Sequence, residues 1–271
     1  MFANAGFCKK AALACAAFLF LSACETTSRL PEGRDAVAKR MAPHGFVTLA
    51  DIPVFTLLRQ ASVTTTLSVY IEGDGAAWYS PYHPPADPTP TKLLVLDMAM
   101  ADRSTAVAYL ARPCQFLDAM VLRDCSPKHW TSDRFSPALV EQMDQALDAL
   151  KRASGASRLR LIGYSGGGVI ATLLAARRQD VQQFVTVAAP LRLKAWVTHH
   201  AVTPLIGSDP ESLTGTLPSA VHFVGGRDRV VPPEIVAPFA ARTLGRLVVL
   251  PDYDHACCWS RDWPQLLKEL K

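Results

Sequence analysis

The sequence contains a serine in a glycine-rich setting that is typical of an activated nucleophile. Residues 163–167 read GYSGG and match the pattern G-x-S-x-G, with Ser165 at its centre. The pattern alone is weak, but here it lies between the apolar segment 159–162 and the largely apolar segment 166–177. This is the order of strand, sharp turn and helix that leaves a serine hydroxyl exposed. We predict Ser165 as the nucleophile; a glycine-rich turn that only packs closely on its neighbours is the alternative.

A serine nucleophile requires two partners later in the chain. Its hydroxyl hardly ionises near neutral pH, so it needs a general base, and the base needs an acid that fixes its tautomer. Segment 221–224 runs into Gly-Gly-Arg-Asp, which places Asp228 in a glycine-made turn after a strand. Segment 247–250 is followed within a few residues by His255. We predict Asp228 as the acid and His255 as the base.

Other histidines and aspartates compete for these roles. His222 lies within an expected strand, where a core histidine is the simpler interpretation. His199 and His200 belong to a longer segment, 190–218, and could line a pocket. Asp252 and Asp254 are close to His255 in sequence, although side chains so near rarely reach the imidazole edge without contortion.

The reaction of a serine with a carbonyl also requires two backbone N–H groups directed at the developing negative charge. Gly166, directly after the nucleophile, is one candidate donor. The other is expected in the Gly-Asp-Gly turn after segment 67–72, where we choose Asp74 first and Gly75 second. A dinucleotide-binding loop at this turn is weakly supported, because Trp78 stands where a third glycine would be needed.

Apolar segments alternate with amphipathic ones from residue 46 onward, so these residues must be positioned by a parallel sheet. Crossover helices then cover both faces, and the loops at the carboxyl ends of the strands carry the function. We predict the α/β class, with a mostly parallel, doubly wound sheet and a small cap from 190–218. The expected strands are 46–49, 54–58, 67–72, 106–110, 159–162, 184–188, 221–224 and 247–250; the expected helices are 93–100, 166–177, 259–270 and one that starts after Ser136 and carries apolar residues from Leu139 to Leu150.

Ser165, Asp228 and His255, in that order and with the turn at 163–167, resemble the α/β-hydrolase superfamily. Segments 72–75 (EGDG), 112–115 (RPCQ) and 254–255 also look like a bacterial family of α/β-hydrolase lipoproteins. The resemblance implies a serine hydrolase that works through an acyl-enzyme. Glu72 departs from it, because many esterases carry His before the glycine, so lipase-like specificity is not implied.

The first residues read as an export signal. Lys9 and Lys10 precede the apolar run 11–21, and the following Leu-Ser-Ala-Cys resembles the lipobox of bacterial lipoproteins. We expect a signal peptide over 1–23, a lipidated tether over 24–42 that begins at Cys24, and a hydrolase domain over 43–271. Acyl chains on Cys24 would anchor the domain to a membrane. An ordinary signal with a chance cysteine is the alternative; Glu25 favours the outer membrane, facing the periplasm, by analogy with sorted lipoproteins.

Charge and cysteine content limit the partners. The formal net charge is +4, and removal of the two signal lysines leaves about +2, which predicts no nucleic-acid partner. We expect no metal or organic cofactor. Four cysteines remain after the anchor, an even number that suits an oxidising compartment. Cys114 and Cys125 are the expected disulfide, whereas Cys257 and Cys258 could bond to each other, pair elsewhere or stay reduced.

Three function classes follow from these residues. The first is a serine hydrolase that cleaves an ester, thioester or amide, with acyl transfer as a variant. The second is a non-catalytic binding or structural lipoprotein, which would not need all three of Ser165, His255 and Asp228. The third is a zinc site of His255, Cys257 and Cys258, which adjacent cysteines make geometrically poor.

Overall fold

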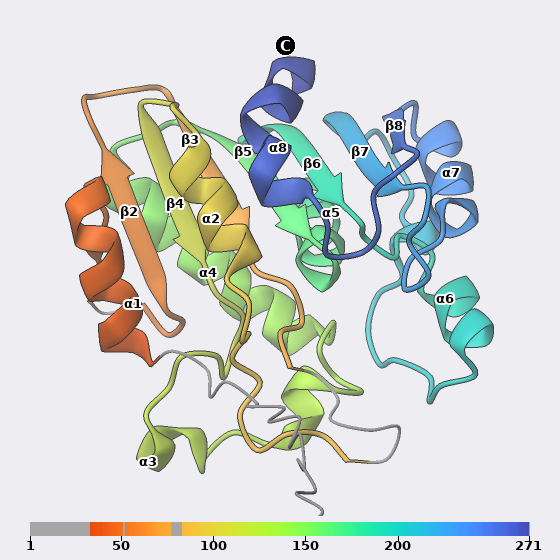
Figure 1. The fold of residues 1–271 in the computed structure, drawn as a ribbon, viewed down its shortest axis with the longest axis horizontal. Coiled ribbons are helices and arrows are strands. Elements are labelled where there is room, and N and C mark those ends of the chain that lie inside the picture. Colours follow the sequence, from red (N-terminus) through yellow and green to blue (C-terminus); the bar gives the residue numbers. More distant parts are fainter. Residues whose placement is uncertain (1–32, 51, 77–82, 271) are drawn as a thin grey trace, which may run out of the picture.

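The computed structural model describes residues 33–50, 52–76 and 83–270, and these form an eight-stranded sheet with helices on both faces (Figure 1). The order across the sheet is β1-β2-β4-β3-β5-β6-β7-β8. β2 pairs antiparallel with both β1 and β4, and the other five pairs of neighbouring strands are parallel. The strands are β1 (Val47–Thr48), β2 (Thr56–Gln60), β3 (Thr66–Ile71), β4 (Ala106–Leu110), β5 (Arg158–Tyr164), β6 (Val181–Val187), β7 (Ser219–Gly225) and β8 (Arg246–Leu250).

The strand order reverses at β3, which has β4 on one side and β5 on the other. At its end Ile71 pairs with Gly163, so the turn after β3 and the turn after β5 emerge side by side. Such a reversal opens a crevice beyond the carboxyl ends of the strands, since the two connections leave toward opposite faces. The predicted GDG turn and Ser165 therefore lie in adjacent loops.

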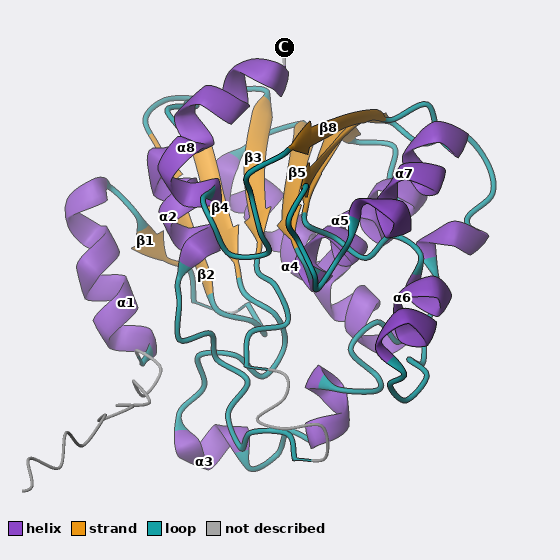
Figure 2. Ribbon diagram, turned by 45° about the vertical axis from the view of Figure 1, so that its right-hand side comes forward, coloured by secondary structure: helices purple, strands orange, loops and turns teal. Residues whose placement is uncertain are grey.

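Helices cover the sheet in two layers, as the crossover connections require (Figure 1). α1, α2 and α8 contribute to one apolar cluster, α4 and α5 contribute to another on the opposite face, and α7 packs beside the last strands. Figure 2 shows the loops gathered at the carboxyl ends of the strands, with α3 and α6 among them. The helices are α1 (Arg34–Met41), α2 (Leu94–Ala101), α3 (Ala119–Leu122), α4 (Pro137–Ser154), α5 (Gly166–Arg177), α6 (Leu193–His200), α7 (Pro233–Arg242) and α8 (Trp259–Leu266).

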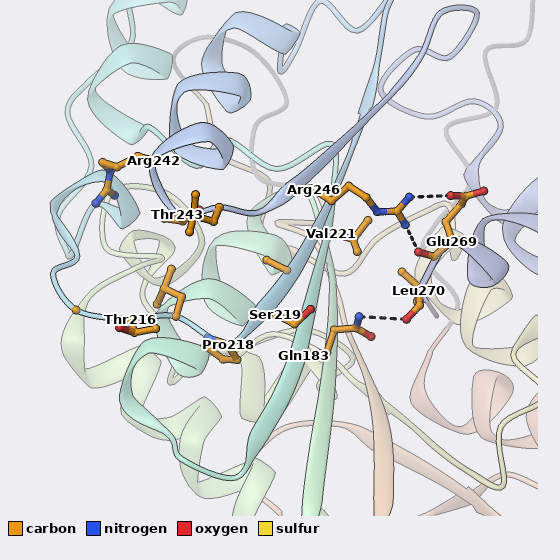
Figure 3. Close-up of a pocket in the computed structure, with 14 residues that line it drawn as sticks. Gln183, Thr216, Pro218, Ser219, Val221, Arg242, Thr243, Arg246, Glu269 and Leu270 are labelled. Carbon is orange, nitrogen blue, oxygen red and sulfur yellow. Dashed lines mark hydrogen bonds and ion pairs between the residues drawn. The ribbon is translucent and has the colours of Figure 1, made fainter.

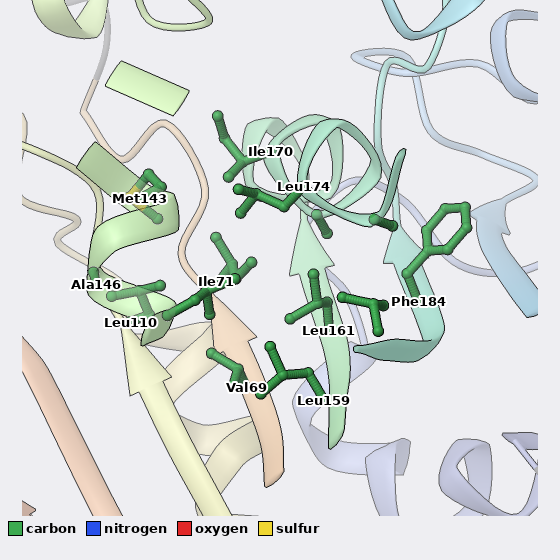
Figure 4. Packing of buried hydrophobic residues seen from close by; sticks show 14 of the residues in the cluster. Val69, Ile71, Leu110, Met143, Ala146, Leu159, Leu161, Ile170, Leu174 and Phe184 are labelled. Atoms are coloured by element: carbon green, nitrogen blue, oxygen red, sulfur yellow. The ribbon is translucent and has the colours of Figure 1, made fainter. Parts of the chain in front are cut away.

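One face of the central strands packs against α4 and α5 (Figure 4). Side chains alternate along a strand, so Ile71 and Leu161 point toward these helices, where they meet residues such as Leu174. The apolar positions predicted on the long helix are all buried, because they recur at the helical period on its inner side. These positions are Leu139, Val140, Met143, Ala146, Leu147 and Leu150.

The opposite face is rich in aromatic residues, and α8 is attached to the centre of the sheet there. Trp263 is fully buried and its indole N–H donates to the Tyr70 hydroxyl at 2.8 Å. The Tyr70 hydroxyl in turn donates to the Asp102 carboxylate at 2.8 Å. Each buried polar tip thus has a partner, which removes the main cost of burying tyrosine and tryptophan.

Four helices were not among those expected from the sequence: α1, α3, α6 and α7. Part of the expected tether is α1, whose Val37 and Met41 are buried with Phe55 against the sheet. α7 was not anticipated, because Pro232 and Pro233 at its start resemble a loop, although proline suits a first helical turn. The expected signal peptide and Cys24 lie outside the described residues. Among the helices that are described, none has the length and apolar character needed to cross a bilayer.

Replacement of Leu161 by alanine should lower the free energy of unfolding by about 2–5 kcal/mol, because it leaves a cavity in the central strand. Leu161 is fully buried, whereas Leu244 is 94% exposed and provides a matched control. Leu244→Ala should change stability by less than about 0.5 kcal/mol. Urea unfolding of the two variants measures the difference, and an equal effect of both would contradict this packing.

Candidate active site

Ser165 stands on a sharp turn between β5 and α5. It has φ 50° and ψ −123°, an unfavourable conformation for a residue with a side chain, and its N–H donates to Val187 O at 2.8 Å. The turn leaves no room for a side chain at Gly163, where a Cβ would lie 2.2 Å from Gly167 O. Gly167 is equally confined, because a Cβ there would lie 2.3 Å from Ile71 O, so both positions require glycine.

The structure brings the three residues predicted from the sequence into contact. His255 Nε2 lies 3.1 Å from Ser165 Oγ, and His255 Nδ1 lies 2.8 Å from Asp228 Oδ2. Both are hydrogen-bond distances. The imidazole can therefore accept a proton from the serine while its other nitrogen donates to the carboxylate.

The Asp228 side chain is fully buried and has a fixed orientation. Its Oδ1 accepts the N–H groups of Val230 and Val231, both at 2.8 Å, which leaves Oδ2 for His255. Two backbone donors and the imidazole thus satisfy a carboxylate that water does not reach. The turn after β7 therefore presents this acid in a single direction.

The alternative residues occupy other places. Asp252 pairs with Arg227, and Asp254 accepts the N–H groups of Ala256 and Cys257. His222 is buried in the core with Nδ1 2.8 Å from Thr186 Oγ1, and burial lowers its pKa to about 4. His222 is therefore neutral at physiological pH and lies away from the serine, as expected for a core histidine.

The loop that carries His255 is fastened on its backbone side. His255 O accepts the Tyr164 hydroxyl at 2.8 Å and the Trp259 indole N–H at 3.0 Å. The Tyr164 ring also lies 5.3 Å from the imidazole, centroid to centroid. The residue before the nucleophile and the first residue of α8 thus determine where the imidazole stands.

Ser165 and His255 open into a cavity of about 260 Å³. Asp74 and Gly75 line the same cavity, which places the GDG turn opposite the serine. The Asp74 carboxylate also lies against Gly166, where a Cβ would come within 1.9 Å of Oδ1. All three predicted oxyanion-hole residues are thus gathered beside Ser165. The other described lining residues are Glu72, Gly73, Ala76, Pro90, Thr91, Lys92, Leu94, Tyr164 and Ala256.

A larger cavity, about 630 Å³, lies at the opposite edge of the sheet, where β7 and β8 begin (Figure 3). Its charged groups are engaged with protein atoms: Arg246 pairs with Glu269, and Arg242 donates to backbone carbonyls. Gln183 donates to Leu270 O. Because its described lining residues do not bring an acid, a base and a nucleophile together, size alone does not make it the reactive site.

Comparison with solved structures finds the same arrangement of strands and helices in several serine hydrolases. A puromycin hydrolase matches with a TM-score of 0.61 and 16% identity, over 82% of this chain and 37% of that one. An α/β serine hydrolase homologue from Coxiella burnetii matches with a TM-score of 0.53 and 17% identity, over 83% and 94% of the two chains. The chain has the α/β-hydrolase fold.

A third structure with the α/β-hydrolase fold, a Pyrococcus furiosus esterase, has a TM-score of 0.58 and 13% identity, over 84% of this chain and 90% of the esterase. This chain spans well under half of the puromycin hydrolase. No protein-family model and no curated protein sequence matches the chain.

Within this α/β-hydrolase fold the segment 190–218 does not line the described part of the Ser165 cavity. It contains α6 and a short 3-10 helix, Pro210–Ser212. The Trp196 indole N–H donates to Val230 O at 2.8 Å, and His200 Nε2 lies 2.7 Å from the same oxygen. The expected cap thus packs on the loop after β7 that carries Asp228.

The four cysteines in the described part of the chain form two disulfides. Cys114 bonds to Cys125, as predicted, and Cys257 bonds to Cys258 across a cis peptide. His255 has Asp228 and Ser165 at its two nitrogens, which differs from a zinc site built on His255 and the adjacent cysteines. Among the described residues, Cys114, Cys125 and His129 are the one group with metal-like spacing, and two of its members are in a disulfide.

Sequence reasoning did not identify the polar groups beneath the GDG turn. Glu72 is buried, and its carboxylate accepts the Tyr109 hydroxyl at 2.8 Å and the Gly73 N–H at 2.9 Å. Burial raises the pKa of Glu72 to about 7, although Tyr109, Gly73 and Arg112 act in the opposite direction. The only signal in the sequence was that Glu stands where many esterases have His.

The raised pKa of Glu72 predicts a pH-dependent contribution to stability. Between the ordinary carboxyl pKa and about 7 the folded protein keeps a proton that the unfolded chain has released, so stability falls as pH rises through this window. A pKa that differs by one between the folded and unfolded states corresponds to about 1.4 kcal/mol. Glu72→Gln should therefore gain stability relative to the wild type as pH rises from 5 to 8.

Urea unfolding at intervals across this range provides the measurement, because the difference between the two proteins cancels all other titrating groups. Exposed Glu234→Gln is the matched control and should follow the wild type at every pH. A Glu72→Gln difference that stays constant with pH would show that this carboxyl titrates normally.

Proposed function

We propose that this protein is a serine hydrolase that cleaves an ester, thioester or amide through an acyl-enzyme. One observation carries the proposal: a single imidazole lies 3.1 Å from Ser165 Oγ and 2.8 Å from the buried Asp228 carboxylate. A binding protein has no need of this linear arrangement. The serine hydrolases of similar fold support the same class of chemistry.

In the proposed reaction Ser165 Oγ attacks the carbonyl carbon while His255 Nε2 takes the hydroxyl proton. The tetrahedral intermediate collapses, the bond to the leaving group breaks, and His255 returns the proton to that group. Water then repeats the sequence on the acyl-enzyme and releases the acid. Asp228 keeps Nδ1 protonated and stabilises the imidazolium that forms in each half-reaction.

The backbone N–H groups of Gly166 and Asp74, with Gly75 as the neighbouring alternative, stabilise the oxyanion in this proposal. Gly166 begins α5, so its N–H is directed out of the helix and belongs to the positive end of the helix dipole. Asp74 and Gly75 face the same cavity from the turn after β3. None of these steps requires a metal or an organic cofactor.

Acyl transfer to an alcohol or amine acceptor uses the same residues and is the variant of this proposal. We also propose export and lipidation at Cys24, with the domain held at a membrane surface, most simply the outer membrane facing the periplasm. The lipobox-like segment before Cys24 and the pairing of Cys114 with Cys125 support export, because disulfides persist in oxidising compartments.

A fluorophosphonate probe should label the full-length protein, purified in detergent, in a manner that depends on Ser165. Labelling should disappear in Ser165→Ala, because the probe phosphonylates the activated hydroxyl, and should slow at least about 1000-fold in His255→Ala. Ser62→Ala, on the exposed loop after β2, is the matched control and should react like the wild type.

Gel fluorescence with a time course gives both the site and the rate. Equal labelling of the wild type and Ser165→Ala, or no labelling of either, would favour a non-catalytic binding lipoprotein with this fold.

A further inference from the structure

The Asp74 side chain connects the proposed oxyanion hole to two buried arginines. Arg112 Nη1 donates a hydrogen bond to its Oδ1 at 3.1 Å, and Arg134 Nε lies 3.0 Å from its Oδ2 in an ion pair that lacks hydrogen-bond geometry. Both arginine side chains are only 5% exposed. On its other side the carboxylate lies against Gly166, which leaves no space for a Cβ there. One carboxylate is therefore packed between two guanidinium groups and the residue after the nucleophile.

The two arginines are themselves held in place. Arg112 Nη2 donates to Arg134 O, and Arg134 Nη1 donates to Thr131 O at 3.0 Å. Both guanidinium groups lie over the buried Phe135 ring, at 5.4 and 5.3 Å from its centroid. A planar guanidinium that is fixed by hydrogen bonds and ring contacts can define the position of a carboxylate. A lysine, with its flexible stem, could not do this.

A second connection, through Gln115, joins the loop after β4 to the turn after β3. Gln115 Oε1 accepts the Arg112 N–H at 2.9 Å, and Gln115 Nε2 donates to Gly73 O at 3.1 Å. Cys114, between Arg112 and Gln115, has φ 70° and is bonded to Cys125. The loop after β4 thus contacts both the side chain and the backbone of the turn after β3. This accounts for the RPCQ segment, which the triad does not use.

Charge gives the arginines a second effect. A lone carboxylate beside an oxyanion hole would repel the negative charge that develops in the transition state. Because Arg112 and Arg134 are both charged, the net charge of Asp74 and the two arginines together is positive. The Asp74 carboxylate can then orient the turn without opposing the reaction.

We propose that Arg112 and Arg134 are positioning residues for the oxyanion hole, acting through Asp74. They fix the carboxylate that sets the Gly73–Gly75 turn against Gly166, and they offset its charge. The inference rests on the proposed hydrolase function and adds to it the reason for the two buried arginines. Neither arginine lines the described part of the Ser165 cavity, so their effect reaches the reaction through the turn.

The test compares Arg134→Gln with the wild type, both as full-length protein in detergent. p-Nitrophenyl acetate gives kcat and KM, the fluorophosphonate gives the labelling rate, and phenylboronic acid, which forms a tetrahedral anion on Ser165, gives an inhibition constant. We expect kcat and the labelling rate to fall about 10- to 100-fold, KM to change less than about threefold, and the boronate constant to rise in parallel with the loss in kcat. Partial unfolding would lower the active fraction but leave the boronate constant unchanged.

The matched control is Arg178→Gln at the far end of α5. Arg178 is 11% exposed and pairs with Asp144, Asp148 and Asp180, so its loss should lower the unfolding temperature without changing the boronate constant. In an Asp74→Asn background Arg134→Gln should have less than about twofold further effect, since both changes remove the same link.

If Arg134→Gln does not fold, Arg134→Lys is tested instead with the same measurements of kcat, KM, labelling rate and boronate constant. It retains the charge but loses the planar fork, and we expect a loss of about 3- to 10-fold. A folded Arg134 variant with kcat and boronate constant within about twofold of wild type would overturn the inference. A wild type that does not react at Ser165 would instead overturn the proposed function, so the two failures are distinguishable.

Discussion

The pairing of β3 with β5 is the constraint on which the site depends. The pairing of Ile71 with Gly163 places the end of one strand level with the end of the other, so the turn after β3 stands beside the turn that carries Ser165. A shift of one residue would reverse the faces of all side chains on β3 and remove Ile71 from the core. The register that buries apolar side chains thus also aligns Asp74 with Gly166.

The fold was predictable because its signals are periodic and local. Apolar strands separated by helices imply a parallel sheet, and the long helix after Ser136 buries the residues that its period indicates. Ser165, Asp228 and His255 could be found because each follows a strand, and parallel strands end at one edge. For these residues sequence order and strand ends were sufficient.

The environment of those residues was not predictable, because it depends on contacts between distant loops. Arg134 has no motif around it, and its partner Asp74 lies 60 residues earlier in sequence, on another strand's loop. Tyr164 fills the first variable position of G-x-S-x-G. It donates to the backbone carbonyl of His255, which lies 91 residues later in the sequence. α7 was missed for a different reason, since prolines at its start and inside it hide its apolar face.

The attachment of α8 has a consequence for the order in which the protein becomes competent. His255 is 90 residues from Ser165, and its carbonyl is bound by Trp259, while Trp263 joins the same helix to Tyr70 in the middle of the sheet. The nucleophile turn is held by β5, α5 and Val187 O, yet the imidazole has no fixed place until the helix behind it has packed on the sheet. The serine therefore stays unactivated in any partly folded form in which the last helix is undocked, so completion of the triad reports on completion of the fold.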